Sequence, residues 1–133
     1  MATERTGFTT VTGVEFHSDY VKADSNIITI ISAAGTIVPR GVLVSAVCGA
    51  GSLNSNTIDI DVDDTTYNHY GVELGGDRNT INGSVIDMYN NNAKDLGIYI
   101  AGWHNVGRAN ETYRCGTGIT DAGTGNDVDG LDT

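Results

Sequence analysis

Alternation of apolar and polar residues predicts that the chain is built from short β-strands. The clearest case is 57–64, where Ile58, Ile60 and Val62 alternate with aspartates, as in a strand with one face buried and the other in water. The run 27–31 (IITII) is apolar on both faces, which indicates a strand buried on both sides. Similar short runs predict further strands over 42–48, 71–74, 84–89 and 97–101.

Composition strengthens this interpretation. The chain holds 12 Val, 12 Ile and 16 Thr but only 5 Leu and 2 Lys, and β-branched residues favour the pleated surface of a sheet over a helix. A length of 133 residues suits one domain. We therefore expect an all-β fold, in the form of a compact β-barrel or sandwich that carries an N-terminal arm.

An internal repeat keeps a second architecture open. At an offset of 26 residues, 60–62 (IDV) matches 86–88 (IDM), and 71–79 (GVELGGDRN) matches 97–105 (GIYIAGWHN). A third copy fits only loosely, and a solenoid needs at least three repeats. The alternative to the barrel is therefore a short right-handed parallel β-helix.

Three segments differ in composition. Residues 1–24 are polar and irregular, which suggests an extended N-terminal arm that needs a neighbour to order it. Residues 25–115 hold the predicted strands and form the β domain. Residues 116–133 are rich in Gly and Asp and contain no Lys or Arg, so we expect a loop-like C-terminal tail.

Charge narrows the choice of partners. Lys and Arg total 7 and Asp and Glu total 17, which gives a formal net charge of −10. This charge argues against nucleic acid or an anionic membrane surface as a partner, because both require a positive face. No run of 18 apolar residues could span a bilayer. The excess of Asp and the scarcity of Lys resemble the surfaces of salt-adapted proteins, since salt screens the repulsion between carboxylates.

Candidate chemistry is sparse. Asp59, Asp61 and Asp63 lie on one face of a predicted strand, and such oxygen clusters bind Ca²⁺, although a solvated acidic face is the simpler explanation. The chain has no Gly-x-Ser-x-Gly motif and no distinguishable pair of carboxylates for acid–base catalysis. We therefore expect no catalytic residues, no enzyme activity and no cofactor, with calcium as the one ion to consider.

A family resemblance suggests a role. The strand, Ala/Gly turn and Arg-Gly strand within 25–48, together with 70–74 and 97–102, resemble small head-decoration proteins of tailed viruses. The resemblance implies a virion structural protein that decorates or stabilises a capsid from outside, as a homo-oligomer bound to the major capsid protein or another virion protein. The acidic composition would suit such a protein on a haloarchaeal virus. The segment 75–96 and the acidic tail depart from the family pattern.

This role would place the partner contacts in the arm. Phe8, Val14 and Phe16 are the apolar residues there that we expect to contact the shell by strand addition, and Trp103 is a further candidate for a partner or sugar contact.

The second hypothesis is a carbohydrate-binding or carbohydrate-cleaving β-helix of the tailspike type. It requires a third in-phase rung and a groove in which Tyr67, Tyr70 and Trp103 line one face. A calcium-dependent surface-layer or adhesion module is a third possibility.

Overall fold

The structure, a computed structural model, describes residues 2–4, 9–32, 37–62, 67–89 and 92–132. The described residues form strands and turns without a helix. In chain order the strands are β1 (Ala2–Glu4), β2 (Thr9–Phe16), β3 (Ile27–Ser32), β4 (Ile37–Val44), β5 (Ser52–Asn54), β6 (Thr57–Val62), β7 (His69–Leu74), β8 (Thr80–Asn82), β9 (Val85–Asp87), β10 (Asp95–Ile100), β11 (Val106–Tyr113), β12 (Thr117–Asp121) and β13 (Asp127–Asp132).

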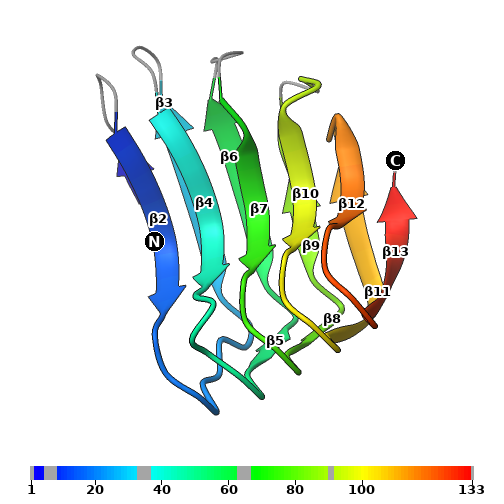
Figure 1. Ribbon diagram of the computed structural model, residues 1–133. Helices are drawn as coiled ribbons and strands as arrows, with labels where there is room; N and C mark the ends of the chain where they lie inside the picture. Colours follow the sequence, from blue (N-terminus) through cyan, green and yellow to red (C-terminus); the bar gives the residue numbers. More distant parts are fainter. Residues whose placement is uncertain (1, 5–8, 33–36, 63–66, 90–91, 133) are drawn as a thin grey trace.

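These strands form two sheets in the described part of the chain, and every pairing between named strands is parallel. The five-stranded sheet has the order β12-β10-β7-β4-β2, and the eight-stranded sheet contains the remaining strands. Successive rungs follow one another from the N-terminal rung to the C-terminal rung (Figure 1). The expected compact barrel or sandwich is therefore wrong, and the alternative holds in its coarser form: the chain is a parallel β-solenoid.

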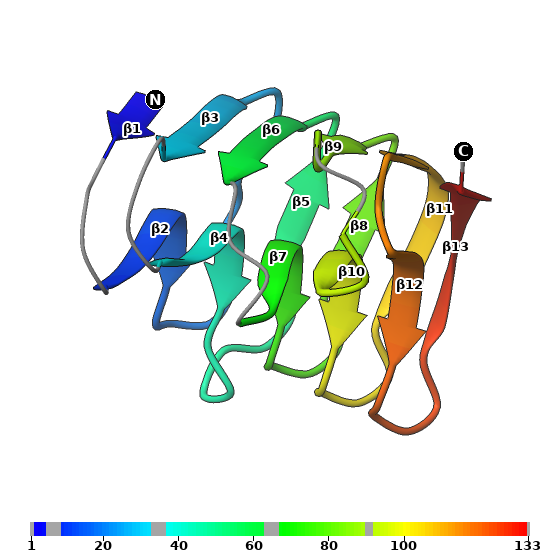
Figure 2. The ribbon, with the colours of Figure 1, turned by 90° about the horizontal axis from the view of Figure 1, so that it is seen from above.

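Each rung repeats one path. The chain crosses the five-stranded sheet, turns a corner into a short strand such as β5 or β8, turns again into β6 or β9, and then returns (Figure 2). Because each strand pairs with its counterpart in the next rung, parallel pairing follows directly from the winding.

The sequence repeat that specifies this winding is Gly-Val or Gly-Ile followed by an outward residue. The apolar partners Val14, Val42, Val72, Ile98 and Ile119 stack in register across the five-stranded sheet, at spacings of 28, 30, 26 and 21 residues. A fixed offset of 26 therefore finds only the pair 71–79 and 97–105. The other apparent match is out of register, because Ile86 pairs with Ile58 rather than with Ile60.

The glycine of each repeat is needed for packing. A Cβ atom on Gly41 would meet the carbonyl oxygen of Gly71 at 2.5 Å and would also overlap Ile58 of the facing sheet; Gly71 has the same relation to Gly97 and Ile86. Only glycine fits where two backbones approach this closely. The glycine column thus brings the two sheets close together, with Ile28, Ile58 and Ile86 packed between them.

Apolar side chains fill the inside of the solenoid. The buried hydrophobic residues of the described chain are Ala23, Ile28, Ile30, Val42, Val44, Cys48, Leu53, Ile58, Ile60, Val62, Val72, Leu74, Ile81, Ile86, Met88, Ile98 and Ile100. They come from every rung between β3 and β10. Since burial of each such side chain contributes about 1.5–3 kcal/mol, stacking of rungs rather than any local element stabilises the fold.

Two corners of the rung place residues in the left-handed region. Tyr20, Ala50, Arg78, His104 and Gly125 occupy the corner after the five-stranded sheet, with φ between 56° and 69°. The second corner holds Ser25, Ser55, Gly83 and Ala109, with φ between 54° and 59°. The stacking of equivalent residues at each corner allows the chain to reverse direction within one or two residues.

Asparagines that follow these corners form ladders through the interior. Asn105 is completely buried; its Oδ1 accepts from the backbone N of Asn79 at 2.8 Å, and its Nδ2 donates to Gly76 O and to Asn126 Oδ1. A second ladder contains Asn26, Asn56, Ser84 and Asn110. These amides satisfy backbone groups that the turns would otherwise leave unpaired inside the protein.

The two terminal segments contain strands of the solenoid. Residues 9–16, which we expected in an extended arm, form β2 and pair with β4 along its length. The expected tail contains β12 and β13, which pair with β10 and β11.

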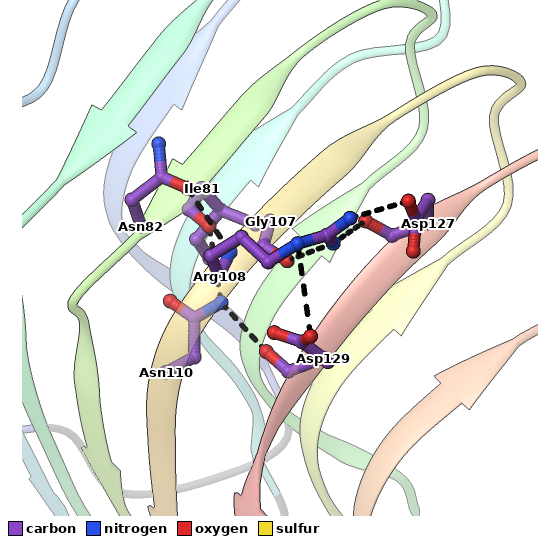
Figure 3. Close-up of polar contacts among 7 residues, drawn as sticks. All are labelled: Ile81, Asn82, Gly107, Arg108, Asn110, Asp127 and Asp129. Carbon is purple, nitrogen blue, oxygen red and sulfur yellow. Dashed lines mark hydrogen bonds and ion pairs between the residues drawn. The ribbon is translucent and has the colours of Figure 1, made fainter.

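The last rung is also fastened by Arg108. This guanidinium donates to Gly107 O, to Asp127 O and to the carboxylate of Asp127, and lies 3.7 Å from Asp129 (Figure 3). The Arg108 guanidinium lowers the pKa of the Asp127 carboxyl below its usual value. These contacts hold β13 against β11 where their register shifts.

Candidate functional site

The outward face of the five-stranded sheet carries a row of large side chains. Arg40 on β4 is in register with Tyr70 on β7, and Tyr70 with Leu96 on β10. In β7 the order of burial places His69, Gly71, Val72 and Leu74 inside, and Tyr70 and Glu73 outside. Two consecutive inward residues at Gly71 and Val72 shift the alternation, so the outward positions are the residue before the glycine and the residue two after it.

Tyrosines form the centre of this face. The rings of Tyr70 and Tyr99 lie on neighbouring strands with centroids 5.5 Å apart and planes tilted by 59°. The guanidinium of Arg40 stands over the Tyr70 ring, 5.4 Å from its centroid. Such aromatic and cation–π contacts fix the orientation of the rings. Tyr70 is therefore held between a cation on one side and a second ring on the other.

Charge at this face is partly compensated. Arg40 Nε donates to the carboxylate of Glu73, and both side chains are about one-fifth exposed, at 22% and 19%. Because the guanidinium has five N–H donors, this ion pair leaves four of them for other acceptors. Arg40 is thus held in place and can still donate hydrogen bonds to a ligand.

A shallow pocket of about 320 Å³ lies beside this row. Its lining residues come from β4, β7 and the turns that precede β7 and β10: Val38, Arg40, Tyr67, Asn68, Tyr70 and Lys94. Asn68 Nδ2 donates to the hydroxyl of Tyr70 at 3.3 Å, and 39% of Tyr67 is exposed. The pocket therefore combines aromatic surface, amide groups and two cations over three adjacent rungs.

A buried polar pair supports the pocket from inside. His69 and Asp95 point into the solenoid where β7 and β10 begin, with His69 Nδ1 2.7 Å from Asp95 Oδ1, and each side chain is 1% exposed. The second oxygen of Asp95 accepts from the backbone N of Asn92 at 2.8 Å. His69 Nε2 has no hydrogen-bond partner. This pair fixes the starts of the two strands whose next residues on the outward side border the pocket.

The aspartates predicted to bind calcium lie on the other sheet. Asp59 points outward from β6 in register with Asp87 of β9, and Asp63 lies outside the described residues. Burial, followed by the nearby charge of Asp87, raises the pKa of Asp59, whereas Arg114 donates to both oxygens of Asp87. Asp61, also on β6, is exposed.

Within the described ranges no group of three or more His, Cys, Asp or Glu side chains is arranged to hold a metal ion. The calcium hypothesis for Asp59, Asp61 and Asp63 stays a prediction.

The residues predicted to contact a partner fall in different places. Val14 and Phe16 are partly buried and pack against the core of the solenoid. Phe8 lies outside the described residues. Trp103 is 58% exposed at the corner after β10, where its backbone N donates to Asp77 Oδ1 at 2.8 Å. The structure therefore does not gather these four residues on one docking surface that it describes.

The requirements set for a carbohydrate-binding β-helix are met in part. A third in-phase rung is present, and Tyr67 and Tyr70 border one pocket. Trp103 lies at the corner instead, outside that pocket.

Sequence reasoning missed Arg40, Lys94 and Tyr99. Alignment of the Gly-Val and Gly-Ile pairs at variable spacing would have placed Arg40 and Tyr70 in one row, since each directly precedes the glycine.

Comparison with models of known protein families, with curated proteins and with solved structures finds no match. The described residues also contain no helix of the length and hydrophobicity that crossing a bilayer requires. Function must therefore be argued from the site itself.

Proposed function

We propose that this chain is a carbohydrate-binding β-solenoid whose binding surface is the outward face of the five-stranded sheet around Tyr70. The observation that carries the proposal is the pocket in which Tyr67 and Tyr70 stand beside Arg40, Asn68 and Lys94. Sugar rings have an apolar C–H face that packs on aromatic rings and hydroxyl groups at their rim that pair with amides and charged side chains. The pocket offers both kinds of group within reach of one ligand.

Rigidity also supports this role. The binding residues lie on strands or immediately before them, and ladders of glycine and asparagine fix the rungs relative to one another. Groups held in position before a ligand arrives lose little conformational entropy on binding. A shallow site with few contacts per sugar gains from this, because each contact is weak.

The capsid-decorating role inferred from the family resemblance, with its homo-oligomer, capsid partner and location on the virion surface, stays a prediction. Its expected docking arm included Val14 and Phe16, which pack against the core and are therefore not exposed for a partner. We place carbohydrate binding first for this reason. The proposal concerns binding and assigns no catalytic residue.

The test is a panel of oligosaccharides screened on the purified protein, followed by titration calorimetry with those that bind. Replacement Tyr70→Ala is expected to weaken binding at least tenfold, because the stacking surface is lost, whereas Tyr70→Phe retains most of the affinity. Tyr113→Ala is the matched control, since Tyr113 lies on the outward side of β11 in the other sheet. Absence of binding across the panel, or equal losses in Tyr70→Ala and Tyr113→Ala, would contradict the proposal.

A further inference from the structure

We infer that the ligand of this face is an anionic oligosaccharide, with carboxylate or sulfate groups on its sugars, that lies across the strands so that Arg40 and Lys94 contact it together. This inference rests on the proposed carbohydrate-binding function and specifies its ligand class. It follows from three features of the described chain: the sign of the pocket, the contrast with the other arginines, and the spacing of the rungs.

The pocket is positive on a strongly negative protein. The formal charge of the chain is −10, with only 7 Lys and Arg, yet the pocket is lined by Arg40 and Lys94 and by no carboxylate. Glu73 contacts Arg40 from outside the lining and offsets one of the two positive charges. The pocket therefore retains one net positive charge, which favours an anion over a neutral sugar.

Arginines elsewhere in the later rungs are neutralised. Arg108 is bound by Asp127 and lies near Asp129, and Arg114 is bound by both oxygens of Asp87. In these places the basic group serves to fasten one rung to the next. Lys94, in contrast, is exposed at the rim of the pocket, where an ammonium group is available to a ligand charge.

The spacing of the rungs indicates how the ligand lies. Arg40 is on β4 and Lys94 directly precedes β10, with β7 between them. Adjacent strands are about 4.8 Å apart, so the two cations stand on rungs roughly 10 Å apart. A pyranose unit in an extended chain is about as long as one strand spacing. An oligosaccharide of three or more units can therefore stack on Tyr70 and reach both cations, whereas a monosaccharide cannot.

The experiment compares each acidic tetrasaccharide with its own carboxyl-reduced form, in which every carboxylate is converted to a neutral hydroxymethyl group. Tetramers of galacturonate, of mannuronate and of alternating glucuronate and N-acetylglucosamine serve as probes in calorimetric titrations. We expect at least one acidic tetramer to bind tenfold or more tightly than its reduced form, and the corresponding monosaccharide to bind far more weakly.

Variants connect this preference to the pocket. Lys94→Gln is expected to weaken binding of the acidic tetramer about tenfold and to leave the reduced form unchanged, because only the charge-assisted contact is lost. Lys22→Gln is the matched control; it changes the net charge equally, but Lys22 pairs with Ser52 at a different part of the rung. Equal effects of the two variants would show that overall charge, and not the pocket, sets the preference, and would overturn the inference.

The outcomes separate the two proposals. Equal binding of acidic and reduced tetramers, both weakened by Tyr70→Ala, would overturn the anionic ligand and leave carbohydrate binding intact. Failure of every acidic and reduced tetramer to bind, together with a negative oligosaccharide panel, would overturn both.

Discussion

The outward faces of the two sheets are built on the same rungs but carry different chemistry. On the five-stranded sheet, Arg40, Tyr70 and Tyr99 contact one another across three strands. On the eight-stranded sheet, Asp59 and Asp87 lie side by side, and Arg114 binds Asp87. The inward positions of both sheets are, by contrast, nearly uniform in their Ile, Val and Leu side chains.

This contrast shows how the rung divides its tasks. Inward and corner positions set the winding and are constrained by packing, whereas outward positions are free to differ because they touch water. A change at an inward position should therefore damage both faces equally, and a change at an outward position should alter one face and spare the fold. The following predictions test this division, from the largest expected effect to the smallest.

The largest effect is expected from Gly71→Ala. The added Cβ would meet the carbonyl oxygen of Gly97 at 2.5 Å and overlap Ile86 of the facing sheet, so the rungs must separate. We expect a loss of about 3 kcal/mol or more in the free energy of unfolding, measured with urea.

Gly83→Ala is the control for that variant. Gly83 has a positive φ of 59° but open space around it, and Ser55 and Ala109 adopt the same conformation at equivalent corners. Its cost should be about 1 kcal/mol. Similar losses for Gly71→Ala and Gly83→Ala would contradict the role assigned to the glycine column.

An intermediate effect is expected from Asn105→Ala. This change leaves the amide groups of Asn79 and the carbonyl oxygen of Gly76 without their partner inside the protein. The expected loss is about 2–3 kcal/mol, because buried polar groups without hydrogen bonds are costly. Asn68→Ala, at the exposed pocket rim, should change stability by less than about 0.5 kcal/mol; a comparable loss at both sites would argue against the ladder.

The smallest effect is expected on the acidic face and depends on pH. Burial and the charge of Asp87 raise the pKa of Asp59, so the folded state binds the Asp59 proton more tightly than the unfolded state does. Stability from this group is present below the unfolded pKa, near pH 4, and is lost as the pH rises through the higher folded pKa. Asp59→Asn should therefore stabilise the protein slightly at pH 7 and not at pH 3, as thermal unfolding at the two pH values would show.

Asp127 provides the opposite case. Its pKa is lowered by Arg108, so its contribution is present above the unfolded pKa and is lost as the pH falls through the folded pKa. Asp127→Asn should destabilise the last rung at pH 7 and have no effect at low pH. The same sign of change at pH 7 for Asp59→Asn and Asp127→Asn would contradict these assignments.

The sequence predicts the strands better than their arrangement. Alternation around Ile58, Ile60 and Val62 is correct because one face of β6 is buried and the other is not. The solenoid was underrated because the turns between rungs differ in length, so that only Val72 and Ile98 are separated by the offset that was tested. Alternation specifies which face of a strand is buried but not whether its neighbours are parallel.

The candidate site was predictable only in part. Tyr67 and Tyr70 were named as groove residues because aromatic residues are few in this chain. Arg40 and Lys94 carried no local signal, since their proximity arises from winding over more than 50 residues. The corner asparagines did carry one: a residue in the left-handed region directly precedes Asn at 26, 56, 79, 105, 110 and 126.

The variable length of the rungs has a consequence for the evolution of this protein. Equivalent positions in successive rungs are separated by as few as 21 and as many as 30 residues, yet the strands stay in register. Duplication or deletion of a whole rung would therefore lengthen or shorten the sheet by one strand without disturbing its neighbours. The number of sugars recognised could then change by gene duplication alone, one unit at a time.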